Sequence, residues 1–313
     1  MDIRNEQFYR ALVEHSPDAI LILGADLKIS FSTLKDLRQI GMPAADPVGV
    51  SLFDCASEEC RDEMAGWLDQ AIAEPGRVHR YEFVGRERVR GGRHYVAIAT
   101  NLRGHPAVQG IVINIRDVTT RKLSEMEAQR DAMYDGLTGL ARREFFAQQT
   151  RKAIARAIRH EEVLAMMFVD IDGFKEVNDA LGHGAGDRLL KDVGARLRDT
   201  LREDDSIGRG QLLENEDRIA RLGGDEFTVM LTKLTVPENA ALVAQRMLAA
   251  VAAPYSIDNK DVRVTVSIGI AVFPQDGRSA EELLRSADKA MYAAKKLGKN
   301  TYTFHSQSAS DAA

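Results

Sequence analysis

The chain has 313 residues, a formal net charge of -5 and 44% hydrophobic residues. Its length is about twice that of a common single domain, so two domains with separate cores are expected. Charges of both signs are spread along the sequence without a basic block, which excludes nucleic acid from the expected partners.

Two further classes of protein are excluded. The only cysteines, Cys55 and Cys60, have no partners at metal-ligand spacing and form no disulfide framework. No apolar run reaches the roughly 18 residues that span a bilayer, and the first residues lack the apolar stretch of a secretion signal. We therefore expect a cytoplasmic protein without a membrane span.

Residues 1–116 are predicted to form a first domain, with a short helix followed by strands. The apolar run 18–23 stops near Gly24, and 27–31 resumes with alternating polarity, which predicts a hairpin. Similar patterns predict three later strands, at about 80–86, 93–101 and 109–116.

Residues 117–134 are polar and favour a helix, and they are predicted to be a signalling linker. Four apolar residues are spaced roughly as one seam, namely Val118, Leu123, Met126 and Met133. A solvated tether that happens to be helical remains the alternative.

Residues 135–305 alternate longer helices with strands. The run 163–169 is almost wholly apolar, as expected of a strand covered on both faces. The runs 219–222 and 227–231 flank two glycines and predict a hairpin with a tight turn. The remaining elements are predicted as helices at about 173–181, 185–203, 237–253 and 279–297, strands at 262–272 and 301–304, and a disordered tail at 306–313.

Acidic residues stand at the ends of these elements. Asp170 closes the buried strand, and Asp225 and Glu226 lie in the hairpin turn, which the topology can place beside it. Carboxylates of this kind suit Mg²⁺, which keeps its other positions for water and substrate phosphates. Gly223 and Gly224 either leave room for a triphosphate or form an ordinary turn.

Other polar positions have both a structural and a functional interpretation. Asp172 precedes a predicted helix, where N-capping is favoured over metal ligation. Lys175 and Asn178 share a helical face, so they either meet phosphate and a base edge or are solvated.

Asp187 near a helix start either caps it or accepts hydrogen bonds from a guanine edge. Three lysines, Lys295, Lys296 and Lys299, are expected in the last turns of a helix. Cations are favoured there by the helix dipole, and phosphate contact is the sharper interpretation.

Seven ordered motifs carry a family resemblance: 135–140, 168–175, 178–179, 182–187, 221–227, 267–271 and 287–295. By these motifs residues 131–304 resemble the catalytic domain of the GGDEF diguanylate cyclases. Residues 5–120 resemble a PAS sensor domain.

The resemblance implies an α+β fold: a PAS-type antiparallel sheet domain (1–116), a signalling helix (117–134) and a polymerase-palm-like, ferredoxin-like GGDEF domain (135–305). It implies a PAS-regulated enzyme that condenses two GTP into cyclic di-GMP and pyrophosphate. The expected cofactor is Mg²⁺, with Mn²⁺ as a substitute. The expected partners are GTP, a second copy of the chain in a homodimer, and downstream cyclic di-GMP receptors.

The resemblance also assigns roles by position. The catalytic residues are Asp170, Asp225 and Glu226, with Glu226 as a ligand or proton acceptor, and the metal ligands are Asp170, the Ile171 carbonyl and Asp225. Asn178 and Asp187 would read guanine. The full set expected to bind substrate is Phe174, Lys175, Asn178, His183, Asp187, Gly223, Gly224, Lys295 and Lys299.

Three departures from the family pattern stand out. Lys299 replaces a common arginine and loses bidentate geometry, and Arg142 replaces an asparagine with no assigned effect. Glu214 stands where an inhibitory-site arginine is frequent, after an apparent insertion at 206–216. We hypothesise weak or absent product inhibition through this site, seen as undiminished initial rates when cyclic di-GMP is added.

The sequence assigns no ligand to the PAS domain. His79, His94 and His105 are expected in strands or loops rather than as haem ligands, and a ligand-free dimerisation module is an equal alternative to a chemosensor. For the whole chain, a catalytically silent GTP-binding or partner-binding regulator and a hybrid cyclic dinucleotide synthase remain the alternatives.

Overall fold

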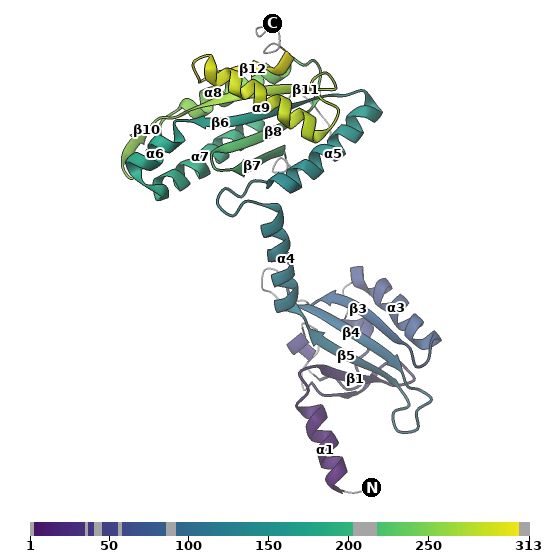
Figure 1. The fold of residues 1–313 in the computed structure, drawn as a ribbon. Coiled ribbons are helices and arrows are strands. Elements are labelled where there is room, and N and C mark those ends of the chain that lie inside the picture. The colour runs from purple at the N-terminus through teal and green to yellow at the C-terminus, as the bar shows by residue number, and fades with distance from the viewer. Residues whose placement is uncertain are drawn as a thin grey trace. The chain divides into compact units, whose positions relative to one another are not determined.

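A computed structural model describes residues 3–34, 37–40, 46–55, 58–85, 92–202 and 218–306. The chain divides into two compact units, Met1–Glu127 and Ala128–Ala313 (Figure 1). Three features of the sequence analysis lie outside the described residues: the side chains of Cys55 and Cys60, the segment 203–217 with Glu214, and the tail from 307.

The first unit is an antiparallel sheet with helices around it. Its five strands lie in the order β2-β1-β5-β4-β3. Leu21, Leu23 and Ile113 of the sheet pack with Trp67 and Leu68 of a helix in one buried core. The elements are α1 (Ile3–Glu14), β1 (Ala19–Leu23), β2 (Ile29–Ser32), α2 (Leu52–Cys55), α3 (Glu58–Ala73), β3 (Val78–Val84), β4 (His94–Asn101) and β5 (Ile111–Asp117), so the predicted hairpin and later strands are confirmed.

The linker forms helix α4 (Thr119–Met133), which is fastened at its start to the first unit. The Thr119 N–H donates to Asp117 Oδ1 at 2.9 Å, and the His94 N–H donates to Thr119 Oγ1 at 2.9 Å. Lys122 Nζ lies 2.9 Å from Glu82 Oε2 on β3. No residue of α4 is buried. Of the predicted apolar seam, Leu123 and Met126 are exposed and Met133 is half-buried in the single chain, whereas Val118, just before the helix, is buried.

The second unit has a five-stranded sheet in the order β12-β11-β6-β8-β7 and a separate β9–β10 hairpin. The sheet is antiparallel except for the parallel pair β11–β12. Its elements are α5 (Arg143–His160), β6 (Val163–Asp172), α6 (Phe174–Leu181), α7 (His183–Arg202), β7 (Ile219–Gly223), β8 (Glu226–Leu234), α8 (Asn239–Ala252), β9 (Tyr255–Ile257), β10 (Lys260–Val262), β11 (Thr265–Phe273), α9 (Ala280–Lys296) and β12 (Tyr302–Phe304).

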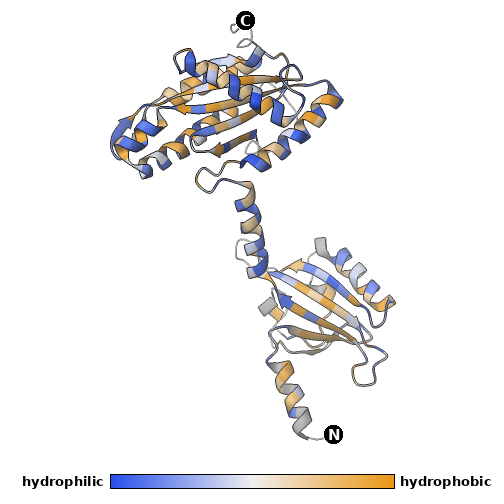
Figure 2. Cartoon of the chain, in the orientation of Figure 1, coloured by the Kyte–Doolittle hydropathy of each residue, from blue (hydrophilic) through white to orange (hydrophobic). Residues whose placement is uncertain are grey.

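Helices cover both faces of this sheet because β6 is apolar on both faces. Met167 and Val169 pack in the core that includes α7 and α8, whereas Met166 and Phe168 pack in the core that includes α5 and α9. Figure 2 shows mainly hydrophobic central strands between helices that carry both hydrophilic and hydrophobic stretches. The prediction of a strand buried on both faces is confirmed.

Helix α9 approaches the sheet most closely at Gly269 of β11. A Cβ atom added to Gly269 would lie 1.9 Å from the Ala287 carbonyl oxygen and 2.1 Å from the Met291 nitrogen. Only a glycine leaves room for this contact, which sets the height of α9 above the sheet.

One predicted strand is wrong in its bounds. The run 262–272 contains the end of β10, a break and then β11, and β10 turns back on β9 through two residues with positive φ, Asp258 and Asn259. In the part of the chain that the structure describes, we find no helix with the length and hydrophobicity needed to cross a membrane.

Candidate functional site

The acidic residues predicted from sequence meet at one end of the β6–β8 pair. Asp170 and Glu226 are opposite each other in the antiparallel register. The Ile171 N–H donates to the Asp225 carbonyl oxygen at 3.3 Å, which holds the hairpin turn beside the end of β6. Three carboxylates from two separate parts of the sequence are thereby brought together.

This acidic cluster has perturbed ionisation. Burial raises the pKa of Asp170, and the charges of Asp225 and Asp172 add to this effect, while Lys295, whose Nζ lies 2.6 Å from Asp170 Oδ1, opposes it. Burial also raises the pKa of Glu226, with a further contribution from Asp170. Like charges held together away from water favour a bound cation.

The donors at this end of the sheet fit Mg²⁺. The described residues contain no group of three His, Cys, Asp or Glu side chains arranged to hold a metal, so the candidate ligand set consists of two carboxylates and a backbone carbonyl. Asp170 and Asp225 supply two carboxylates, and the Ile171 carbonyl is a third hard oxygen on the same strand end. A set of this size leaves positions for water and substrate phosphates, as Mg²⁺ prefers.

The turn between β7 and β8 is open around both glycines. Gly224 has a φ of 53° and Gly223 a φ of 146°, and a Cβ added at either would have no atom within 4 Å. The left-handed conformation explains why glycine is favoured at Gly224. The empty space beside the backbone would admit a phosphate chain.

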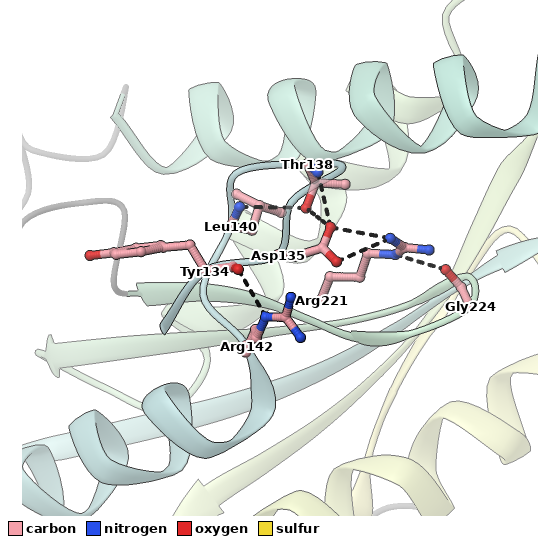
Figure 3. Close-up of polar contacts among 7 residues, drawn as sticks. All are labelled: Tyr134, Asp135, Thr138, Leu140, Arg142, Arg221 and Gly224. Carbon is pink, nitrogen blue, oxygen red and sulfur yellow. Dashed lines mark hydrogen bonds and ion pairs between the residues drawn. The ribbon is translucent and has the colours of Figure 1, made fainter. Parts of the chain in front are cut away.

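An ion pair that the sequence analysis did not identify supports this turn (Figure 3). Arg221 Nη1 lies 3.1 Å from Asp135 Oδ1, and Arg221 Nε donates to the Gly224 carbonyl at 2.9 Å. Thr138 donates to the same Asp135 oxygen from its N–H and its hydroxyl, at 2.9 and 2.7 Å. The loop between α4 and α5 is thus fastened to the glycine turn.

Arg142, which replaced an expected asparagine, contributes to the same loop. Its Nε donates to the Tyr134 carbonyl at 2.8 Å (Figure 3), and its N–H donates to the Met133 carbonyl at 2.8 Å. Arg142 therefore closes the loop that begins at the end of α4, with one bond from its side chain and one from its backbone.

Asp135→Asn is expected to lower the free energy of unfolding by about 1–2 kcal/mol at pH 7. Burial opposes ionisation of Asp135, but hydrogen bonds from Thr138 and Arg221 outweigh it, so the pKa of Asp135 is lowered. A lowered pKa stabilises the fold above the unfolded value of about 3.9 and loses that contribution as the pH falls through the folded value. Denaturant titrations of both proteins at several pH values test this, and a difference that persists at the lowest pH would contradict it.

The expected guanine-reading residues lie on α6 and α7, which meet at Gly186. A Cβ at Gly186 would lie 2.0 Å from Asn178 Oδ1 and 3.2 Å from Phe174 Cζ. Lys175 is exposed on α6, and His183 and Asp187 are exposed on α7. Because α7 begins at His183, four residues before Asp187, the capping alternative for Asp187 is wrong.

Gly186→Ala is expected to raise the KM for GTP roughly tenfold with a smaller effect on kcat. The added methyl group would overlap the Asn178 amide and turn it away from the base that it is expected to read. Steady-state kinetics would measure the change. Gly184→Ala, on the same helix in open space, is the control, and equal KM values for the two variants would contradict the prediction.

Two further positions require correction. Asp172 does not cap α6, whose N-cap residue is Gly173 without a side-chain bond. Its buried carboxylate instead binds β11 and the turn after α9, because these lie beside it in the folded sheet. Lys295 and Lys296 are in the last turn of α9, but Lys299 lies beyond the helix end with a φ of 64°.

Comparisons with known proteins agree with this geometry. The family model described as diguanylate cyclase, GGDEF domain, matches residues 132–301, and a PAS fold model matches 13–123. The bifunctional diguanylate cyclase/cyclic di-GMP phosphodiesterase MucR of Pseudomonas aeruginosa is 42% identical over 177 residues, covering 56% of this chain and 24% of MucR. Diguanylate cyclase TpbB of the same species is 39% identical over 171 residues, covering 54% of this chain and 37% of TpbB.

Among solved structures, the coiled coil and GGDEF domain of DgcB from Caulobacter crescentus, in complex with c-di-GMP, is similar with a TM-score of 0.50. It is 26% identical and covers 59% of this chain and 93% of that one. The chain spans 24 to 37% of the length of MucR and TpbB, so these curated relatives contain much sequence without a counterpart here.

Proposed function

The chain belongs to the GGDEF family of diguanylate cyclases, and from that membership we propose that it condenses two GTP into cyclic di-GMP and pyrophosphate in a PAS-regulated reaction. The observation that carries the proposal is the acidic cluster beside an open glycine turn. In it Asp170 lies opposite Glu226, and the Ile171 N–H donates a hydrogen bond to the Asp225 carbonyl. Both acids of the hairpin are retained.

In this proposal each chain binds one GTP, and a homodimer brings two together. The ribose 3′-hydroxyl of one GTP gives up its proton and attacks the α-phosphorus of the other, and pyrophosphate leaves. The 3′-hydroxyl of the second nucleotide then attacks the α-phosphorus of the first in the same way, which releases a second pyrophosphate and closes the ring. Mg²⁺, when bound, supplies positive charge for the phosphates and lowers the pKa of the attacking hydroxyl. Asp170, Asp225 and the Ile171 carbonyl would hold it, with Glu226 as a ligand or proton acceptor.

The remaining residues bind and orient GTP. The amide of Asn178 and the carboxylate of Asp187 complement the guanine edge, with Phe174 and His183 beside them on the same helices. Lys175, Lys295 and Lys299 supply ammonium groups for the triphosphate, which follows the backbone at Gly223 and Gly224. Lys295 already meets a carboxylate of the cluster, which supports its place at the reacting phosphates.

Regulation is assigned to the first unit and to α4. The PAS fold and the GGDEF domain are joined through this helix, whose start is fastened to β3 and β4. We place the reaction in the cytoplasm, where GTP is made available and receptors for the product would respond.

Purified protein incubated with Mg²⁺ and GTP, with and without ATP, tests the proposal by mass identification of the products. Cyclic di-GMP alone would support it. GTP that is bound but unchanged would overturn it in favour of a silent regulator. A mixed cyclic dinucleotide would identify a hybrid synthase, against which the Asp187 carboxylate argues because it complements guanine rather than adenine.

A further inference from the structure

We infer that Asp172 is a positioning residue whose carboxylate holds the turn carrying Lys299 against the strand that ends in the acidic cluster. The inference rests on the proposed function, because Lys299 is a proposed phosphate contact. It replaces both interpretations that the sequence allowed for Asp172, an N-cap and a metal ligand.

Asp172 is 9% exposed, and its carboxylate accepts hydrogen bonds from three donors. Its Oδ2 accepts from Thr265 Oγ1 at 2.7 Å and from the Asn300 N–H at 3.2 Å. Its Oδ1 accepts from Ser267 Oγ at 2.8 Å. Two of the donors come from β11 and the third from the turn, so one side chain joins three segments.

The turn after α9 has an unfavourable backbone that needs such an anchor. Three successive residues have positive φ: Gly298 at 113°, Lys299 at 64° and Asn300 at 49°. A lysine rarely adopts this left-handed conformation, because its Cβ approaches the backbone carbonyl. Strained residues of this kind persist only where surrounding contacts hold them, and they are frequent at functional sites.

Other hydrogen bonds hold this turn on either side of Asn300. The Lys299 N–H donates to the Ala294 carbonyl at 3.3 Å on the helix side, and the Ile268 N–H donates to the Thr301 carbonyl at 2.9 Å on the strand side. The Asp172 bond to Asn300 lies between them. Removing the Asp172 carboxylate removes this hydrogen bond between the turn and β6.

The position of Asp172 on β6 gives this anchor a consequence for substrate. Asp170, two residues earlier on the same strand, contacts Lys295 of α9. Asp170 and Asp172 therefore tie both ends of the segment that carries the two proposed phosphate-binding lysines to one strand end. Lysine loses much conformational freedom on binding, so a prearranged backbone favours phosphate affinity.

A double-mutant cycle on the full chain tests the inference. The dissociation constant of GTP is measured by calorimetry with Ca²⁺ as the cation, so that turnover is not required. Asp172→Ala and Lys299→Ala are each expected to weaken GTP binding about tenfold. The double variant is also expected to be weakened about tenfold rather than a hundredfold, because Asp172 acts through Lys299.

Asp276→Ala is the matched control, since its carboxylate accepts the Val272 N–H at 2.7 Å at the opposite end of β11. It is expected to leave GTP affinity unchanged, alone or with Lys299→Ala. Asp172→Asn keeps one oxygen acceptor and gains one NH₂ donor for the three partners. Unlike Asp172→Ala, it is expected to bind GTP within about threefold of the wild-type affinity. If Asp172→Ala does not fold, Thr265→Val is used in its place. It removes the hydrogen bond from Thr265 to the Asp172 carboxylate and is combined with Lys299→Ala in the same way.

Multiplicative losses in the Asp172–Lys299 cycle, or in the Thr265–Lys299 cycle that replaces it, would overturn the inference while leaving the proposed function intact. A wild-type chain that binds no GTP would overturn the proposed function, and this inference with it.

Discussion

Asp225→Asn is expected to lower kcat for cyclic di-GMP formation by about a thousandfold or more. The substitution keeps the shape of the side chain and the backbone contact to Ile171, but it removes one of two carboxylates that fit Mg²⁺. The variant would therefore hold less of the positive metal charge that neutralises the reacting phosphates. Product formation at saturating Mg²⁺ and GTP, followed by chromatography, measures the effect.

Asp170→Asn should have a similar effect, and it also removes the charged partner of Lys295. Asp261→Asn is the control, since this exposed aspartate lies on β10, and it should leave kcat unchanged. An active Asp225→Asn or Asp170→Asn enzyme would show that the metal ligands have been assigned to the wrong residues.

Gly269→Ala is expected to destabilise the second unit by about 3 kcal/mol and to reduce activity at least about tenfold. The added methyl would lie 1.9 Å from the Ala287 carbonyl oxygen and 2.1 Å from the Met291 nitrogen. Because both are backbone atoms, α9 itself must move away from β11. That movement displaces Lys295, which lies one turn beyond Met291, from Asp170.

Thermal unfolding together with steady-state kinetics tests this prediction. Gly136→Ala is the matched control, because a Cβ at Gly136 would meet no atom within 4 Å and its effect should be within about 0.5 kcal/mol of zero. Unchanged stability and kcat in Gly269→Ala would show that α9 does not depend on this close approach.

The parts of the fold that were predictable are those with strong local patterns. The unbroken apolar run at 163–169 predicted a strand buried on both faces, and the glycines at 223–224 predicted the hairpin turn. By contrast, the β9–β10 hairpin was missed because its strands have only three residues each. The two residues of its turn, Asp258 and Asn259, both have positive φ, and aspartate and asparagine are favoured in two-residue hairpin turns for this reason.

The site was predictable in its residues but not in its connections. Asp172 follows the local rule for an N-cap, yet its partners are 93 to 128 residues away in the sequence. The Asp135–Arg221 pair joins residues 86 apart. Such contacts depend on which strands become neighbours, and local periodicity does not contain that information.

The exposure of α4 has a consequence for its own order. An isolated helix of 15 residues is marginally stable in water, and α4 has no buried residue to stabilise it. In the single chain its helical population therefore depends on the contacts at its two ends, Thr119 and Lys122 at the start and the Tyr134–Arg142 loop at the end. Loss of either set would shift the helix–coil equilibrium of α4 in the single chain toward the coil.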